Sequence, residues 1–369
     1  MKRLLVSLLV VAALQQATYA QLTTVADGGN KKAIVGERIG LTDVTIHYDR
    51  PAVKGREGKI WGELVPYGLT DLGFGSSKAA PWRAGANENT TIHFSTPVTV
   101  QGKPVAAGTY ALFIELGKEA STLILSKNST SWGSYFYNPS EDALRVPVKQ
   151  QVVDRLVERL KYEFVQQTEN SATVALQWEK LLFAFTIETD VKQQQLQSFR
   201  NELRSDKGFD WRPWVQAANW CADNNTNLEE ALTWAEYGVN GKYIGEKNFT
   251  SLSTKARILG LLNRQEEAAA VMAEALPLGN MQELHNYGRQ LLNQKKSKEA
   301  AAVFKANYKK YPAVYTTNMG MARALSSEAK YKDALKFATA ALAQAPDEDS
   351  KKSINSMMEK LKAGTDINE

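Results

Sequence analysis

Apolar and polar residues alternate through the first half of the chain. Residues 44–48 (VTIHY), 91–95 (TIHFS) and 109–113 (TYALF) carry apolar side chains at alternating positions. This is the period of a strand with one buried face. Turn-forming pairs such as Arg50-Pro51 and Lys54-Gly55 separate these segments. Short alternating strands with frequent turns predict an antiparallel β-sandwich or barrel.

The same alternation continues to about residue 190. Residues 144–148 (LRVPV) predict an edge strand, because Pro147 has no N–H to donate to a neighbouring strand. Residues 160–164 and 174–178 alternate again, and Asn170-Ser171 between them favours a hairpin. We therefore expect a β-rich domain over residues 33–190.

Near Thr189 the period changes from two to that of a helix. Residues 191–212 are predicted as a linking helix, residues 213–362 as helical repeats, and residues 363–369 as a tail. Small, large and proline residues recur 34 positions apart, as in the pairs Gly288 and Ala322, Leu291 and Leu325, and Pro312 and Pro346. This period resembles the tetratricopeptide repeat, in which small residues let two helices approach closely. The resemblance implies a region that binds a protein partner.

The N-terminus has the pattern of a signal peptide. Residues 1–20 combine Lys2 and Arg3 with an apolar run and a small-residue site, so we expect cleavage after Ala20 and a periplasmic or secreted protein. Residues 21–32 are polar and are expected to form an arm. The net charge of +5 includes those two leader residues, so the mature chain is only weakly basic and nucleic acid is a poor candidate partner. After cleavage the sequence predicts no membrane span.

Charged and aromatic residues gather in the turns of the β-rich segment. Loops on a rigid sheet commonly carry binding sites, and Arg side chains suit carboxylate or phosphate groups. We therefore consider a site that binds a small anionic ligand, a glycan or a peptide. The structural alternative is that Arg50–Glu88 and Arg83–Asp49 ion pairs lock the loops. The candidate ligand-binding residues are Asp49, Arg50, Arg56, Trp61, Trp82, Arg83, Asn87 and Glu88.

These motifs carry a family resemblance. The runs HYDRPAVKGR, IWGELVPYG, WRAGANENTTIHF and AAGTYALF occur in order within residues 33–190. They resemble the bacterial family called domain of unknown function 2911. The resemblance implies an exported protein with a β-rich domain and no established activity. In that family the PYG motif commonly lies a residue or two before the Trp-Arg pair, whereas here a spacer, residues 69–81, separates them.

Catalytic and metal-binding patterns are scarce. His47 and His93 fall on the polar faces of their strands and lack a ligand-spacing motif, so we expect neither a metal nor a cofactor. His285 is expected at the surface of a repeat helix. Cys221, the single cysteine, is expected to be a buried structural thiol.

Two functions remain open. The first is an exported binding or scaffold module that uses the Arg/Trp loops for a ligand and the repeats for a protein partner. The second is a hydrolase-like enzyme, with Asp49 or Glu88 as general base and Arg83 as an electrostatic clamp. The sequence contains no nucleophile-base pair that would favour the second.

Overall fold

The computed structural model describes residues 29–368. The chain divides into two compact units, one up to Gln195 and one from Leu196 onward. The expected signal peptide, residues 1–20, lies outside the described residues, and so does most of the polar arm.

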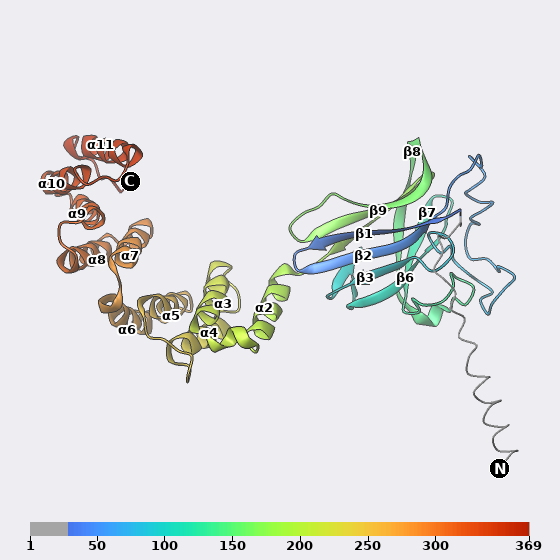
Figure 1. Cartoon of the computed structure of the whole chain (residues 1–369), viewed down its shortest axis with the longest axis horizontal. Helices are drawn as coiled ribbons and strands as arrows, with labels where there is room; N and C mark the ends of the chain where they lie inside the picture. Colours follow the sequence, from blue (N-terminus) through green and yellow to red (C-terminus); the bar gives the residue numbers. More distant parts are fainter. Residues whose placement is uncertain (1–28, 369) are drawn as a thin grey trace, which may run out of the picture. The chain divides into compact units, whose positions relative to one another are not determined.

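The first unit contains one antiparallel sheet. Its nine strands, counted over the described residues, hydrogen-bond in the order β1-β2-β3-β6-β7-β8-β9-β4-β5 (Figure 1). The expected antiparallel β architecture is thus confirmed, and one continuous ladder connects all of these strands. The strand bounds are β1 Lys31–Ile39, β2 Thr42–Arg50, β3 Thr91–Phe94, β4 Val98–Val100, β5 Lys103–Val105, β6 Gly108–Glu115, β7 Ala120–Ser126, β8 Asp142–Val165 and β9 Ser171–Glu188.

Alternation in the sequence becomes alternation of burial. On β2 the side chains of Val44, Ile46 and Tyr48 are buried, whereas Asp43 before them and His47 between them are exposed. Buried side chains from both ends of the ladder join a single hydrophobic cluster. Full burial of one such side chain contributes about 1.5–3 kcal/mol, so this cluster supplies the rigid base for the loops.

The long hairpin of β8 and β9 departs from simple alternation. β8 as a whole lies between β7 and β9, but within the described chain residues 144–148 pair only with β7, because pairing with β9 begins at Lys149. Pro147 therefore lies where the strand has no second neighbour in that part of the chain, as its missing N–H predicted. Further along, the pairing register shifts around Val157, opposite Glu179, whose φ is +51°. At this bulge the consecutive residues Trp178 and Glu179 are both buried.

The second unit is helical. After α2 come successive antiparallel helix pairs, α3 with α4, α5 with α6, α7 with α8 and α9 with α10, followed by α11 (Figure 1). Helical repeats after the sheet are confirmed. The linking helix is shorter than the expected residues 191–212, because α2 ends at Glu202 and the 3-10 helix η2 follows. The bounds are α2 Val191–Glu202, η2 Asp206–Phe209, α3 Trp211–Asp223, α4 Leu228–Asn240, α5 Phe249–Leu261, α6 Gln265–Ala275, η3 Leu276–Leu278, α7 Met281–Asn293, α8 Ser297–Lys310, α9 Tyr315–Ser327, α10 Tyr331–Leu342 and α11 Glu348–Lys362, with η1 Pro139–Glu141 in the first unit.

Small residues set the close packing of these helices. Gly288 on α7 and Gly320 on α9 both face the ring of Phe304, which is fully buried on α8. A methyl group on either glycine would approach that ring to 2.6 or 2.8 Å, respectively. Some helix starts are fixed by side-chain caps; Asn280, for example, forms a capping box with Glu283 at the start of α7.

Two side chains in this unit test the sequence predictions. Cys221 is buried, as expected, and burial raises the pKa of its thiol to about 11, which leaves a poor nucleophile. His285 was expected at the surface of a repeat helix, and this prediction is wrong. The side chain is buried on α7 and packs against Phe304. Across residues 29–368 no helix is both long and apolar enough to cross a membrane.

Candidate functional site

The loops between β2 and β3 enclose a pocket of about 440 Å³. Most of its lining comes from residues 51–86, and Asn30, Ser134 and Trp178 complete it. The spacer of residues 69–81 contributes part of the wall through Thr70, Leu72, Ala80 and Pro81. The segment that departs from the family pattern therefore helps to form the cavity.

The charged lining of this pocket has one sign. Lys54, Arg56 and Arg83 line it, and no Asp or Glu is among its lining residues in the described part of the chain. Lys54 and Gly55 both adopt left-handed φ angles, +50° and +69°, which produce the tight turn that carries Lys54 and Arg56. Within the described part of the chain, the pocket thus presents three positive charges and no negative one.

Neutral groups hold the Arg56 side chain in place. Its Nε donates to the carbonyl oxygen of Val53 at 2.9 Å, and its Nη2 donates to that of Ala52 at 2.7 Å. A carbonyl oxygen orients a guanidinium group without cancelling its charge. Arg56 is therefore positioned and still cationic.

Arg83 is held in a similar way. Its Nη1 donates to the carbonyl oxygen of Asn87, and its guanidinium lies 4.9 Å from the centroid of the Tyr135 ring. Gly133, with a left-handed φ of +63°, lies directly against the guanidinium, where a methyl group would overlap it. The expected Arg83–Asp49 pair does not form between the described residues.

Three indole rings form the aromatic side of the site. Trp82 and Trp178, which both line the pocket, stack with centroids 6.1 Å apart and an interplanar angle of 20°. Trp61 packs edge-on against both, at 5.5 and 5.7 Å, and its Nε1 donates to Glu179 at 3.1 Å. Trp82 is fixed by two backbone hydrogen bonds with Ile114 of β6, both 2.9 Å. Trp61 therefore supports the two indoles that line the cavity.

The structure divides the predicted site residues into two groups. Arg56, Trp82 and Arg83 line the pocket. Arg50 instead donates through Nε to the carbonyl oxygen of Leu160 at 2.9 Å, which ties β2 to β8. The predicted residues that do not line the pocket are Asp49, Arg50, Trp61, Asn87 and Glu88.

The two carboxylates proposed as general bases lie outside the pocket lining. Glu88 forms an ion pair with Lys32 at 2.5 Å, so the expected Arg50–Glu88 pair is replaced by a pair with β1. Asp49 is 4% exposed, and burial raises the pKa of its carboxyl group although a hydrogen bond from Asn87 opposes the shift. The pocket therefore has cations without a carboxylate base, which gives the hydrolase alternative no catalytic pair there.

Sequence reasoning missed Lys54 and Trp178 as lining residues. Lys54 belongs to the same turn as Arg56, so its position in the AVKGR run was a usable signal. Trp178 looked like an ordinary core residue of an alternating strand. The bulge at Glu179 changes the surroundings of Trp178, and no local pattern in the sequence predicts that bulge.

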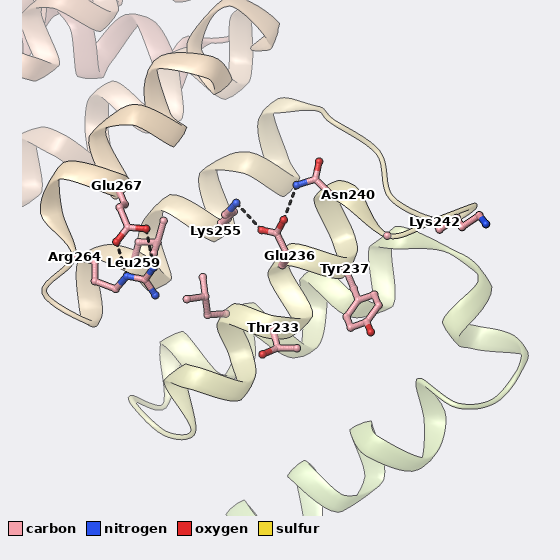
Figure 2. Close-up of a pocket in the computed structure, with 11 residues that line it drawn as sticks. Thr233, Glu236, Tyr237, Asn240, Lys242, Lys255, Leu259, Arg264 and Glu267 are labelled. Carbon is pink, nitrogen blue, oxygen red and sulfur yellow. Dashed lines mark hydrogen bonds and ion pairs between the residues drawn. The ribbon is translucent and has the colours of Figure 1, made fainter.

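A second, larger pocket belongs to the helical unit. It has a volume of about 610 Å³ and lies among α4, α5 and α6 (Figure 2). Among the described residues, four of its five charged lining side chains are paired, Glu236 with Lys255 at 2.5 Å and Arg264 with Glu267 at 2.7 Å, and Lys242 is the fifth. Burial alone would raise the pKa of Glu236, but hydrogen bonds from Lys255 and Asn240 outweigh it and hold the pKa below its usual value. This pocket is thus a weaker candidate for a charged ligand.

The histidines do not assemble a metal centre in the described residues. No group of three or more His, Cys, Asp or Glu side chains there has the geometry to hold a metal ion. His47 and His93 are exposed on the outer face of the sheet, and His93 Nδ1 lies 3.0 Å from Thr109 Oγ1.

The N-terminal unit matches a known family model. Residues 30–187 match the model described as "Protein of unknown function (DUF2911)", which agrees with the resemblance noted in the sequence. No curated protein matches the chain.

Solved structures match the chain over less than half its length. One is described as "YrrB: a TPR protein with an unusual peptide-binding site", with 17% identity, a TM-score of 0.29, and coverage of 46% of this chain and 86% of that one. Another is MamA 41-end from Desulfovibrio magneticus RS-1, with 17% identity, a TM-score of 0.28, and coverage of 42% of this chain and 93% of that one.

Proposed function

We propose that this protein, whose N-terminal unit matches a family of unknown function, is an exported two-part binding protein. The β unit binds a small anionic ligand at its loops, and the helical repeats bind a protein partner. One observation carries the proposal: Lys54, Arg56 and Arg83 line a single pocket together with Trp82, and among residues 29–368 no carboxylate shares the lining.

Electrostatics support an anion in this pocket. Like charges in one cavity repel, and the carbonyl groups that orient Arg56 and Arg83 do not remove that repulsion. A carboxylate or phosphate group would relieve it and would accept short, charge-assisted hydrogen bonds. The indole of Trp82 offers an apolar surface to the rest of the ligand, whether a small molecule, a glycan or a peptide end.

The helical unit supports the second part of the proposal. Stacked helix pairs form extended surfaces that suit a protein segment. The pocket among α4, α5 and α6 could accept one side chain of such a segment. Tyr237 lies on this pocket and is half exposed, as many contact aromatics at protein interfaces are.

The presence of a bound ligand in the purified protein tests the proposed site. Native mass spectrometry of the full mature chain, purified from its own source, should show a bound small anion. Occupancy should fall in Lys54→Gln, because the substitution removes one pocket charge from an exposed side chain. The matched control is Lys59→Gln, an exposed lysine of the same loop outside the pocket lining, which should retain the ligand. An empty wild-type protein, or equal loss in both variants, would contradict the proposed site.

Export is a separate proposal that rests on the pattern of residues 1–20. We expect N-terminal sequencing of the mature protein to begin at Gln21. A cytoplasmic protein that still carries Met1 would contradict it.

A further inference from the structure

Beyond its charges, the loop pocket is notable for its apolar walls. Leu64, Leu72 and Pro81 line it beside the two indoles. Leu64 and Leu72 are 48% and 37% exposed, which is unusual for side chains of this size at one cavity. Exposed apolar residues gathered at one place commonly mark a binding surface. The cavity thus combines cationic side chains with an uncovered apolar wall.

A second and independent feature is the indole of Trp178. Its side chain is only 2% exposed, and its Nε1–H has no hydrogen-bond partner among the described residues. A buried donor without a partner is destabilising, and proteins rarely keep one without a reason. Trp178 lines the same pocket, but its Nε1 atom is itself buried, so an acceptor oxygen of a ligand would complete this hydrogen bond once neighbouring side chains move aside.

We infer that the natural ligand is an amphiphilic anion, a molecule with one carboxylate or phosphate head and an aliphatic body. This rests on the proposed function of the pocket. The head accepts hydrogen bonds from Lys54, Arg56 and Arg83, and also from Trp178 Nε1. The body covers Leu64 and Leu72.

Two other ligand classes fit less well. A neutral sugar needs many hydrogen-bonding partners, whereas the uncharged polar side chains of the lining are only Asn30, Thr70 and Ser134 in the part of the chain that the structure describes. A small inorganic anion would satisfy the cations but would leave the exposed leucines uncovered. At about 440 Å³ the cavity falls within the size range of small-molecule sites, large enough for a head with an attached chain.

Isothermal titration of the full mature chain with matched probes tests this inference. The probes are decanoate, decanol, decyltrimethylammonium and acetate, each below its micelle-forming concentration. Decanoate should bind at least about tenfold more tightly than decanol or acetate, because each of these lacks one of the two interactions. Decyltrimethylammonium should not bind, because its charge is repelled.

Single substitutions then test the head contacts. Trp178→Phe keeps an aromatic ring and removes the N–H, so decanoate should bind about tenfold more weakly. The smaller ring also leaves a void in the core and lowers thermal stability, so binding is measured well below the melting temperature. The matched control is Trp211→Phe, whose N–H is also buried without a partner but belongs to the helical unit, and it should leave decanoate binding unchanged. Lys54→Gln, on an exposed side chain, provides a second test should Trp178→Phe fail to fold.

Each contrary outcome has a distinct meaning. If acetate binds as tightly as decanoate, the ligand does not need an aliphatic body. The amphiphile inference is then wrong, whereas the proposed anion site is still supported. Decanol binding as tightly as decanoate would overturn the role of the cations, and with it the proposed function. No binding by any probe would overturn this inference alone, because native mass spectrometry tests the site independently. Unchanged decanoate affinity in Trp178→Phe would overturn the assignment of its N–H to the head.

Discussion

His285 should make the helical unit sensitive to mild acid. The side chain is 8% exposed, its Nδ1 has no partner among the described residues, and its ring lies 5.6 Å from that of Phe304. Burial, together with the positive charges of Arg323 and Arg289, lowers the pKa of His285 from 6.5 to about 4. The folded protein therefore holds this imidazole in its neutral form at pH values where an exposed histidine is charged.

The sign of the effect follows from proton linkage. In the unfolded chain His285 binds a proton below about 6.5, whereas in the folded chain it does so only below about 4. The unfolded state thus binds more protons between these values. Stability is fully present above pH 6.5 and is lost as the pH falls toward 4. The full loss is about 3 kcal/mol, of which about 2 kcal/mol appears by pH 5.

Thermal unfolding of the helical unit measures this loss. For a unit of this size, 2 kcal/mol corresponds to a decrease of roughly 4–8 °C in melting temperature between pH 7 and pH 5. The comparison variant is His285→Gln, which cannot titrate in that range, while His47 and His93 remain exposed in both proteins. The wild type should lose more stability than the variant. Parallel losses in the two proteins would refute a buried, neutral His285.

Three glycine substitutions give further tests. Gly288→Ala should destabilise the helical unit by about 1–3 kcal/mol in chemical denaturation, because the new methyl would press on Phe304, whereas Gly260→Ala, with open space around it, should stabilise by about 0.5–1 kcal/mol. If Gly288→Ala and Gly260→Ala change the free energy of unfolding equally, the close contact between Gly288 and Phe304 is contradicted. Gly133→Ala should cost about 1–2 kcal/mol through its left-handed backbone and should also weaken ligand binding by displacing Arg83. If Gly133→Ala lowers stability but leaves ligand affinity unchanged, Arg83 does not contribute to ligand binding.

The architecture could be predicted because its signals are local. Alternation on β2 depends on neighbouring residues only, and so do the helical period and the small residues at Gly288 and Ala322. In the described chain, the unpaired edge at residues 144–148 could be predicted because proline itself carries that signal. The position of β8 between β7 and β9 could not, because strand order is a property of the whole sheet and nothing near Pro147 reveals that β9 pairs beyond it.

The site was predictable only in part, for the same reason. Arg56 and Arg83 were found because Arg in a loop is a visible signal, but their partners were not. Glu88 pairs with Lys32 of β1, and both arginines bind backbone carbonyls, which residue type cannot reveal. His285 was misplaced because a polar residue type suggested the surface, whereas its helix face packs against α8.

The stacked indoles of Trp82 and Trp178 also give the molecule an optical property. Two nearly parallel chromophores at this separation couple their electronic transitions, and Trp61 lies edge-on to both. Such coupling produces a paired circular dichroism band whose sign and size depend on the mutual orientation of the rings. Ligand entry into the cavity would rotate or repolarise the pair and alter that band. The β unit therefore contains a built-in spectroscopic reporter of pocket occupancy that needs no added label.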